Sequence, residues 1–572
     1  MVSQLPSRSG RAALVILIVL VSAGATSLYL WNQSRLAAKT DSSGEDRRPE
    51  TTSTAKAATE VVLGETAKDE EPAETNELAD ARATKTAASG TAPKTGAGGT
   101  GGKKLLADWT TPQLAFVITG QAHGYIEPCG CSERMIGGYS RRADFVRMLR
   151  EDRKWPVIAV DVGGLLNMER VFQVQARWKL EALVKGLARM KYDALAVGTE
   201  ELKFGPQKLF EVFQEFKNVD PDFALPFLGA NLTIIDKSLG MPLDYTIVER
   251  GGKKVAIVSI FGEAWKNEVD SFSQEELKVA GVEQTLKRVL AEVQQKEKPD
   301  LYVLLSHDSL DNSKKWAGKF PVFQLVVSAG GYEEPPQTPE KVGNTIVVTS
   351  GIKGKTIGVV GYYPQDRAQP FKYTNIEVAP ETLSNQDSMT QVMREYQERL
   401  KDDYQNLIAE SIPSERKFVG VDACKDCHTK AYEVWKNSKH ANAYVAIDKG
   451  RKGQEKDFVS RVYDPECLCC HVVGWNAQSA QRIDGGFVDM MTTPHLAGQQ
   501  CENCHGPGSE HVALETAGTD MAKMLASRKM MHRSKAEAEQ SCRKCHDGEN
   551  DINWEEVGFE NRWKEVAHPG LD

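Results

Sequence analysis

Residues Cys424-Lys425-Asp426-Cys427-His428 form the first of four Cys-x-x-Cys-His motifs in the last quarter of the chain. The other three motifs are Cys467–Cys470–His471, Cys501–Cys504–His505 and Cys542–Cys545–His546. Two thiols at this spacing reach the two vinyl groups on one edge of a porphyrin, and the next residue then lies under the iron. Paired structural zinc sites are the alternative, but they do not require a His after every Cys pair. The motifs therefore predict four covalently bound haem c groups, with His428, His471, His505 and His546 as proximal ligands.

Length and charge set the broad class of protein. The chain has 572 residues, which is enough for two or three domains. Its 71 basic and 79 acidic residues give a net charge of −8, which argues against a nucleic-acid partner. Three of the eleven cysteines lie outside the motif positions, namely Cys129, Cys131 and Cys469. We interpret Cys469, inside the second motif, as a bystander.

The N-terminal region predicts export. An apolar run at residues 12–31 follows Arg8 and Arg11 and is long enough to span a bilayer with a cytoplasmic N-terminus. A cleaved signal peptide ending near Ala23-Gly24-Ala25 is the alternative. We favour an uncleaved single-pass anchor (residues 1–31) in the cytoplasmic membrane, because the apolar run continues past that site. Both interpretations place the rest of the chain in the periplasm or the cell exterior, as haem c motifs also imply.

Residues 32–104 differ in composition from both of their neighbours. They are rich in Ala, Thr, Glu, Lys and Gly, contain almost no aromatic residues and end in a glycine-rich run. Such a segment cannot bury a hydrophobic core, so we predict a disordered linker.

Residues 105–380 alternate short apolar runs with amphipathic stretches, which predicts an α/β domain. The expected strands are 114–119, 157–162, 194–198, 227–230, 245–249, 255–261, 301–306, 323–328, 345–349 and 356–362. The expected helices include 140–150, 177–190, 206–217 and 281–296. Two antiparallel additions, 243–260 and 344–362, indicate mixed sheets.

Six short stretches of this domain resemble the periplasmic 5′-nucleotidase branch of the calcineurin-like metallophosphoesterases. They are Gly120-Gln121-Ala122-His123-Gly124, Gly137-Gly138-Tyr139-Ser140-Arg141-Arg142-Ala143, Val160-Asp161-Val162-Gly163-Gly164, the run from Tyr192 to Glu201, Gly229-Ala230-Asn231 and Leu304-Leu305-Ser306-His307. The resemblance implies a four-layer sandwich of two mixed sheets flanked by helices. It also implies a dinuclear metal centre that activates water and clamps phosphate.

The metal ligands of that family are mostly replaced in this sequence. The family's ligand positions are occupied by Gln121, Gly164 and Thr199-Glu200, and no His occurs near residues 328–332. His123 and His307 remain. We therefore expect a catalytically degenerate phosphoesterase-like domain that could hold one non-haem metal at best.

The loop Gly124-Tyr125-Ile126-Glu127-Pro128-Cys129-Gly130-Cys131 follows the first of these stretches. Two thiols one residue apart can chelate a soft metal or form a labile disulfide, and His123 and Glu127 are near enough in sequence to share such a site. The loop resembles the Cys-Gly-Cys loop of a degenerate phosphoesterase-like branch found in redox settings. An ordinary exported disulfide and two inert buried thiols remain open alternatives.

Residues 381–413 form the predicted connector. Apolar residues recur at steps of three and four from Met389 to Ile408, which predicts one amphipathic helix of about seven turns over residues 385–411. Pro413 ends it. We expect this helix to pack between the α/β domain and the haem segment.

Residues 414–572 are the predicted haem domain. A segment of this size with four haems has little room for its own core, so we expect a mainly α fold wrapped on the porphyrins. Nine of the eleven histidines lie here. Beyond the four proximal ligands, five are candidate distal ligands: His440, His495, His511, His532 and His568. A haem with two His ligands passes electrons and has no open position for substrate.

The same segment resembles the tetrahaem cytochrome c family of nitrifying bacteria, and more loosely the pentahaem nitrite reductases and octahaem oxidoreductases. The matching stretches are the four motifs with their flanks, Trp435-Lys436-Asn437-Ser438-Lys439-His440-Ala441, and Gly506-Pro507-Gly508-Ser509-Glu510-His511. The resemblance implies a close-packed haem chain, with His440 and His511 at distal-ligand positions. No Cys-x-x-Cys-Lys motif is present, which argues against a nitrite reductase.

These observations predict a membrane-anchored periplasmic tetrahaem c-type cytochrome that mediates electron transfer between redox partner proteins. One alternative is a haem oxidoreductase that acts on a small nitrogen or sulfur compound at a five-coordinate haem. Another is a metal-dependent phosphoesterase or nucleotidase.

Overall fold

A computed structural model describes residues 105–128, 135–168, 173–219, 225–453, 455–547, 550–551 and 554–569. The predicted anchor, the predicted linker, Cys129 and Cys131 lie outside these ranges. Within them, no helix has both the length and the apolar character needed to cross a membrane.

The first sheet of the α/β domain has the strand order β14-β13-β1-β2-β3-β4. These strands are β1 (Leu114–Thr119), β2 (Val157–Asp161), β3 (Ala194–Ala196), β4 (Phe227–Leu228), β13 (Thr356–Tyr362) and β14 (Phe371–Glu377). The strands β1 to β4 are parallel, and β13 runs antiparallel to both β1 and β14. The carboxyl ends of β1, β2 and β3 therefore meet at one edge of the sheet.

The second sheet has the order β11-β12-β10-β9-β7-β6. Its strands are β6 (Tyr245–Arg250), β7 (Lys253–Phe261), β9 (Leu301–His307), β10 (Leu325–Ser328), β11 (Glu340–Val342) and β12 (Thr345–Thr349). The four central strands are parallel, and β6 and β11 are antiparallel edges. A separate two-stranded ladder joins β5 (Leu232–Ile234) to β8 (Leu277–Val279).

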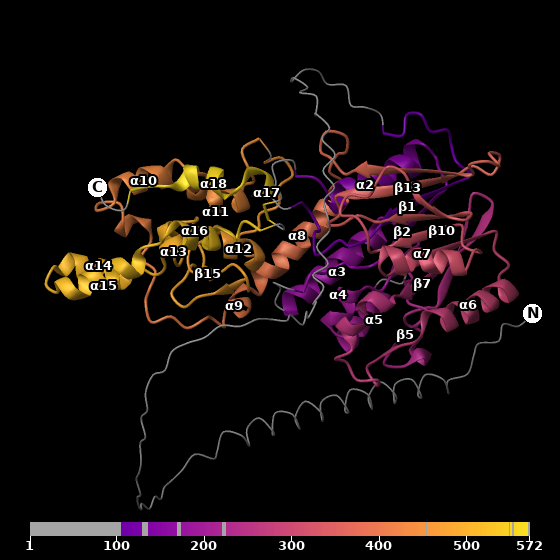
Figure 1. Cartoon of the computed structure of the whole chain (residues 1–572), viewed down its shortest axis with the longest axis horizontal. Helices are drawn as coiled ribbons and strands as arrows, with labels where there is room; N and C mark the ends of the chain where they lie inside the picture. Colours follow the sequence, from indigo (N-terminus) through magenta and orange to yellow (C-terminus); the bar gives the residue numbers. More distant parts are fainter. Residues whose placement is uncertain are drawn as a thin grey trace, which may run out of the picture. The chain divides into compact units, whose positions relative to one another are not determined.

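Strand alternation produces the layers. Phe116 of β1 packs with Val303 of β9 in the cluster between the sheets, whereas Val117 faces the cluster that contains the helices of the first sheet. Those helices are α2 (Tyr139–Arg147), α3 (Gln173–Arg189), α4 (Thr199–Phe204) and α5 (Pro206–Val219). The outer face of the second sheet is covered by α6 (Val282–Lys296) and α7 (Leu310–Lys319). The predicted four-layer α/β sandwich of two mixed sheets is confirmed (Figure 1).

The predicted antiparallel addition at 344–362 is wrong as a hairpin, because β12 and β13 belong to different sheets. Gly351 and Gly354, both with positive φ (69° and 63°), let the chain turn between the sheets. The other predicted addition, β6 with β7, is confirmed.

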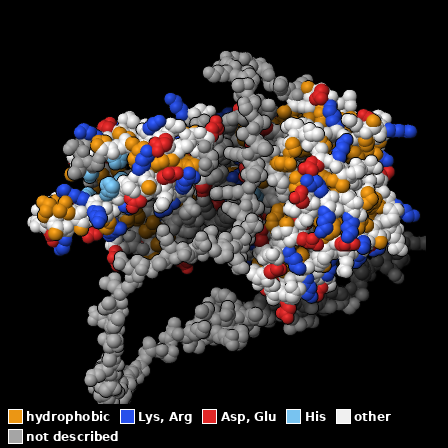
Figure 2. Space-filling view, viewed as in Figure 1, with side chains coloured by type: hydrophobic (Ala, Val, Ile, Leu, Met, Phe, Trp, Pro, Cys, Tyr) orange, Lys and Arg blue, Asp and Glu red, His pale blue; other side chains and the backbone are white. Residues whose placement is uncertain are grey.

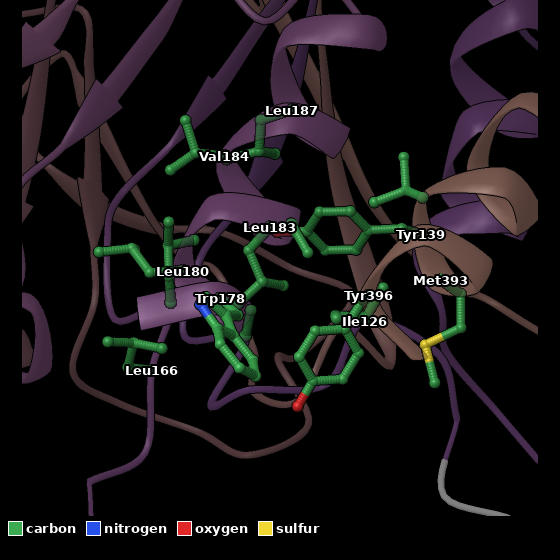
Figure 3. Packing of buried hydrophobic residues seen from close by; sticks show 14 of the residues in the cluster. Ile126, Tyr139, Leu166, Trp178, Leu180, Leu183, Val184, Leu187, Met393 and Tyr396 are labelled. Carbon is green, nitrogen blue, oxygen red and sulfur yellow. The ribbon is translucent and has the colours of Figure 1, made fainter. Parts of the chain in front are cut away.

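The connector forms two helices, α8 (Asp387–Asp402) and α9 (Tyr404–Leu407), rather than one. The break falls at Asp403, whose backbone (φ −102°, ψ 11°) leaves the helical region. Figure 3 shows Met393 and Tyr396 of α8 beside Ile126, Tyr139 and the apolar residues of α3. Gln397 of α8 also donates to Asp464 of the C-terminal segment at 2.9 Å. The predicted packing of the connector between the two parts is confirmed.

The C-terminal segment is mainly helical, as predicted. Its helices are α10 (Thr429–Lys436), α11 (Ala443–Asp448), α12 (Pro465–His471), α13 (Cys501–His505), α14 (Ser509–Ala517), α15 (Met521–Met531), α16 (Lys535–Cys542), α17 (Trp554–Val557) and α18 (Phe559–Val566). The pair β15 (Trp475–Asn476) and β16 (Gln481–Arg482) is its strand ladder. None of α10, α14 and α18 has a buried residue. Helices without a buried face need another surface to pack on, as expected for a segment built around cofactors.

Candidate functional site

Each Cys-x-x-Cys-His motif occupies about one helical turn. The second and third motifs lie in α12 and α13. The first and fourth close the same turn through the backbone, because the N–H groups of His428 and His546 donate to the carbonyls of Cys424 (3.0 Å) and Cys542 (2.8 Å). Residues four apart on a turn lie on one face. The first cysteine and the histidine of each motif therefore lie on the same face of the turn.

The motif thiols are accessible, whereas the additional thiol is not. Cys427 and Cys504 are exposed and the other six motif cysteines are half-buried. Cys469 is only 3% exposed, and its Sγ donates to the carbonyl of Glu466 at 3.3 Å. This position fits the interpretation of Cys469 as a packing residue.

Three motif histidines each face a second histidine. The ring centres are 6.4 Å apart for His428 and His511, 6.0 Å for His546 and His440, and 5.9 Å for His505 and His568. Metal–imidazole bonds of about 2 Å on both sides, plus about 1 Å from each nitrogen to its ring centre, place two axial imidazoles about 6 Å apart. The three pairs therefore have the spacing of two histidines that share one haem iron.

Hydrogen bonds orient these rings. The Nδ1 atom of His505 donates to the Met531 carbonyl at 2.6 Å, and that of His568 faces the Pro569 carbonyl at 3.0 Å. His546 Nδ1 lies 3.0 Å from Asp551 Oδ2, and His511 Nδ1 lies 3.2 Å from Ser527 Oγ. When Nδ1 carries the proton, Nε2 keeps the lone pair that a metal requires. The donor set fits haem ligation.

Burial favours the neutral, ligating form of several of these histidines. Burial, with smaller contributions from His546 and His471, lowers the pKa of His440 to about 4. Burial also lowers the pKa values of His505 and His511. Neutral imidazoles are the form that binds metal.

The fourth motif histidine, His471, and two candidate distal ligands, His495 and His532, lie outside these three pairs. His471 of the second motif directs Nδ1 to the Ala443 carbonyl at 2.6 Å. Among the described residues, the rings of His495 and His532 contact no motif histidine. Figure 2 shows histidine side chains gathered on the surface of the C-terminal segment. The structure thus pairs His440, His511 and His568 with motif histidines, but not His495 or His532.

The carboxyl edge of the first sheet brings together the residues at the family's metal positions. The Oε1 atom of Gln121 accepts from His123 Nε2 at 2.9 Å, and its Nε2 donates to the Ala329 carbonyl at 3.4 Å. A Cβ at Gly164 would lie 2.1 Å from Gln121 Oε1. The Gln121 amide therefore fills the space that a carboxylate at position 164 would need.

His307 is used structurally at both ring nitrogens. Its Nδ1 donates to the Val162 carbonyl at 2.8 Å, and its Nε2 accepts from the Thr199 backbone N–H at 2.9 Å. Burial is the main reason that its pKa falls to about 4. No nitrogen lone pair of this ring is left for a metal.

The neighbouring carboxylates bind backbone. Glu201, at the start of α4, accepts from the N–H groups of Gly164 (3.1 Å), Leu166 (3.3 Å) and Gly198 (2.8 Å), and burial raises its pKa to about 7. Glu200 accepts from the N–H of Met168 at 3.1 Å. Within the described residues, no three His, Cys, Asp or Glu side chains are grouped as metal ligands would be.

The Gly124 loop is described as far as Pro128. Glu127 accepts from the Ser140 N–H at 3.1 Å, and burial raises its pKa to about 7 against the opposing charges of Arg461 and Arg141. Arg461 of the C-terminal segment donates to the Pro128 carbonyl at 3.1 Å. Pro128, just before the two cysteines, therefore contacts the C-terminal segment.

A polar junction between the two parts was not predicted. Asp464 accepts from Gln175 of α3 at 2.8 Å and from Gln397 of α8 at 2.9 Å, and Lys179 of α3 forms an ion pair with Glu466. These partners are far apart in sequence. The one local signal is Lys179 itself, because it lies at helical spacing from Ala176 and Leu183 on the apolar face of α3.

Comparison with known proteins supports both sequence resemblances. Residues 423–506 match the family model "Cytochrome c554 and c-prime". A 108-residue stretch is 30% identical to cytochrome c-554 of Nitrosomonas europaea, covering 17% of this chain and 42% of that protein. A 130-residue stretch is 31% identical to a 5′-nucleotidase of Vibrio cholerae, covering 22% of this chain and 21% of that protein. The chain therefore spans less than half the length of each of these relatives.

Solved structures similar to this chain include a 5′-nucleotidase precursor and a calcineurin-like phosphoesterase. A 5′-nucleotidase precursor from Thermus thermophilus has 18% identity and a TM-score of 0.41, with 53% of this chain and 61% of that chain covered. A calcineurin-like phosphoesterase from Bacillus subtilis has 15% identity and a TM-score of 0.41, with 50% of this chain and 97% of that chain covered.

Proposed function

We propose that this chain is a membrane-anchored periplasmic tetrahaem c-type cytochrome that mediates electron transfer between redox partner proteins. The observation that supports it best is the set of three histidine pairs, spaced 5.9–6.4 Å between ring centres, in which each pair contains one motif histidine. The cytochrome c554 match over residues 423–506 agrees with covalently bound haem c.

The proposed attachment residues follow the motifs. The thioether bonds form at Cys424, Cys427, Cys467, Cys470, Cys501, Cys504, Cys542 and Cys545, and the proximal ligands are His428, His471, His505 and His546. The proposed distal ligands are His511 for His428, His440 for His546, and His568 for His505. Haem c with two His ligands supplies one-electron transfer without an open coordination position.

The protein's part in this function is to hold the imidazoles and to bring the attachment sites together. Carbonyl, carboxylate and hydroxyl groups at Nδ1 fix the ring orientations, so little rearrangement accompanies a change in charge. The motifs are close neighbours, because the thiols of Cys424 and Cys501 interact, and Cys504 lies near Cys542. Short separations between sites favour transfer from one to the next.

The haem content and spin state of the purified protein test this proposal. We expect four haems per chain by the pyridine haemochrome assay. The three haems whose motif histidines face a second histidine should give low-spin optical and electron paramagnetic resonance (EPR) signals, and adding nitrite, cyanide or carbon monoxide should leave these three signals unchanged. Turnover of a small nitrogen or sulfur compound at a high-spin fourth haem would instead favour the haem oxidoreductase, and a protein without haem would contradict both.

We also propose that the α/β domain, residues 105–380, is not a working phosphoesterase. Gln121 occupies the space of a carboxylate at position 164, and both nitrogens of His307 are engaged. We expect fewer than two non-haem metal ions per chain and no hydrolysis of nucleotides or phenyl phosphates. Metal-dependent hydrolysis by the purified protein would overturn this proposal.

We further propose that residues 1–31 anchor the chain in the cytoplasmic membrane and that residues 32–104 link this anchor to the periplasmic part. In this division the connector is 381–413 and the haem domain 414–572. The full chain should sediment with membranes and resist extraction by high salt. A variant in which a cleavable export signal replaces residues 1–31 should be released in soluble form; release of the unaltered chain would contradict the anchor.

A further inference from the structure

Lys179 is a buried cation that the α/β domain places against the second haem-attachment motif. Its side chain is 7% exposed and forms an ion pair with Glu466. Glu466 lies in the first turn of α12 and directly precedes Cys467. Charges in such surroundings are poorly screened by solvent and salt.

The surroundings of Lys179 fix its position. On one side, the loop after β1 covers it, because a Cβ at Gly124 would lie 3.1 Å from its Cδ. On the other side, Asp464 is the N-cap of α12 and is held by Gln175 and Gln397 at 2.8 and 2.9 Å. Glu466 pairs with the ammonium group, Asp464 also acts on it electrostatically, and both carboxylates lie on the peptide that leads into the motif.

Both carboxylates also influence the proton affinity of Lys179. Burial by itself would lower the pKa of Lys179, but Glu466 and Asp464 raise it above its usual value. The side chain is therefore an ammonium ion at neutral pH, and a fixed positive charge stands beside Cys467.

We propose that Lys179 is a positioning residue for the haem attached at Cys467 and Cys470, and that its charge, balanced by Glu466, sets the reduction potential of that haem. The inference rests on the proposed function, since it requires a haem at this motif. Reduction adds one electron to the haem and breaks no bond, so its net charge falls by one. A nearby cation stabilises the reduced state and a nearby anion the oxidised state.

The proposal assigns the α/β domain a role in the redox chemistry. The loop that leaves the sheet edge at Gly124 rests on Lys179, and Arg461 ties Pro128 of the same loop to the haem segment. The domain would therefore act on the second haem through charge and position.

The test is a spectroelectrochemical titration of the full-length holoprotein, in which the electrode supplies the electrons. In Lys179→Met we expect one of the four titrating components to move to lower potential, because Glu466 is left unbalanced. In Glu466→Gln we expect the same component to move to higher potential. Lys179→Arg, which keeps the charge, and the double variant Lys179→Met/Glu466→Gln should lie close to the wild type.

Lys185→Met is the matched control. Lys185 lies on the same helix and pairs with Glu395 of α8, and neither residue is on the haem segment. This variant should leave all four potentials unchanged. Shifts of the same sign in Lys179→Met and Glu466→Gln, or equal shifts of all components, would indicate disturbed packing and overturn the proposal. A haem assay distinguishes failure of the proposed function from failure of this inference. Absence of haem contradicts the proposed function. Four haems whose potentials do not change in the variants contradict only the role of Lys179.

Discussion

The pairing of His511 with His428 can be tested at the level of one side chain. Their ring centres are 6.4 Å apart. In His511→Ala one haem loses its distal ligand, so we expect one of four haems to become high-spin and to bind carbon monoxide, as seen by EPR and optical difference spectra. His532→Ala is the control, because the His532 ring contacts no motif histidine within the described residues. A low-spin His511→Ala protein would contradict the pairing.

His307 gives a pH-dependent prediction. Its pKa is lowered from 6.5 to about 4 by burial, so protons bind the unfolded chain first as the pH falls. The contribution of His307 to the free energy of unfolding is fully present above pH 6.5. It is lost as the pH falls toward 4, by roughly 3 kcal/mol in all. His307→Gln can keep both hydrogen bonds without titrating. Thermal unfolding followed by circular dichroism should show a smaller acid-induced loss in this variant than in the wild type. Identical losses would show that His307 is not responsible.

At the scale of elements, local patterns predicted ten strands of the α/β domain but missed β5, β8, β11 and β14, and they predicted the strand partners less well. Buried apolar runs such as 114–119 and 345–349 were located correctly because burial on both faces leaves a continuous hydrophobic signal. The partner of β13 depends on a turn between sheets, which no local pattern encodes. Motif spacing predicted the proximal histidines. That His568, and not His495, lies opposite a motif histidine depends on tertiary contacts, so the local sequence could not show it. The same is true of the junction at Asp464.

Helix α8 holds its place by packing, which a cavity variant can measure. Leu400 is completely buried in the cluster that α8 shares with α3. Leu400→Ala should lower the free energy of unfolding by about 2–5 kcal/mol, since it removes buried methyl groups and leaves a cavity. Glu398→Ala, at an exposed position of the same helix, should change stability by less than about 0.5 kcal/mol. Denaturant titration compares the two, and equal effects would contradict a packed connector.

At the scale of the whole molecule, the α/β domain and the haem segment share a continuous core. One hydrophobic cluster extends from Ala115 through α3 and α8 to Leu496, and Asp464 joins the two parts through Gln175 and Gln397. We therefore expect the sheet signal in circular dichroism and the haem absorbance to change together on heating.

Asp464→Ala should separate these two transitions. The substitution leaves the buried Gln397 amide without its acceptor, at about 1–3 kcal/mol, and leaves Gln175 with only the Tyr396 hydroxyl, so it weakens the junction more than either part alone. Asp520→Ala is the matched control, because Asp520 also caps a helix, accepting from the Lys523 N–H at 3.1 Å, but lies away from the junction. Loss of that cap should lower stability only slightly and leave the two signals coincident. Two outcomes would show that the two parts unfold independently. One is that the circular dichroism and haem absorbance transitions of the wild type already have different midpoints. The other is that Asp464→Ala and Asp520→Ala change these midpoints equally.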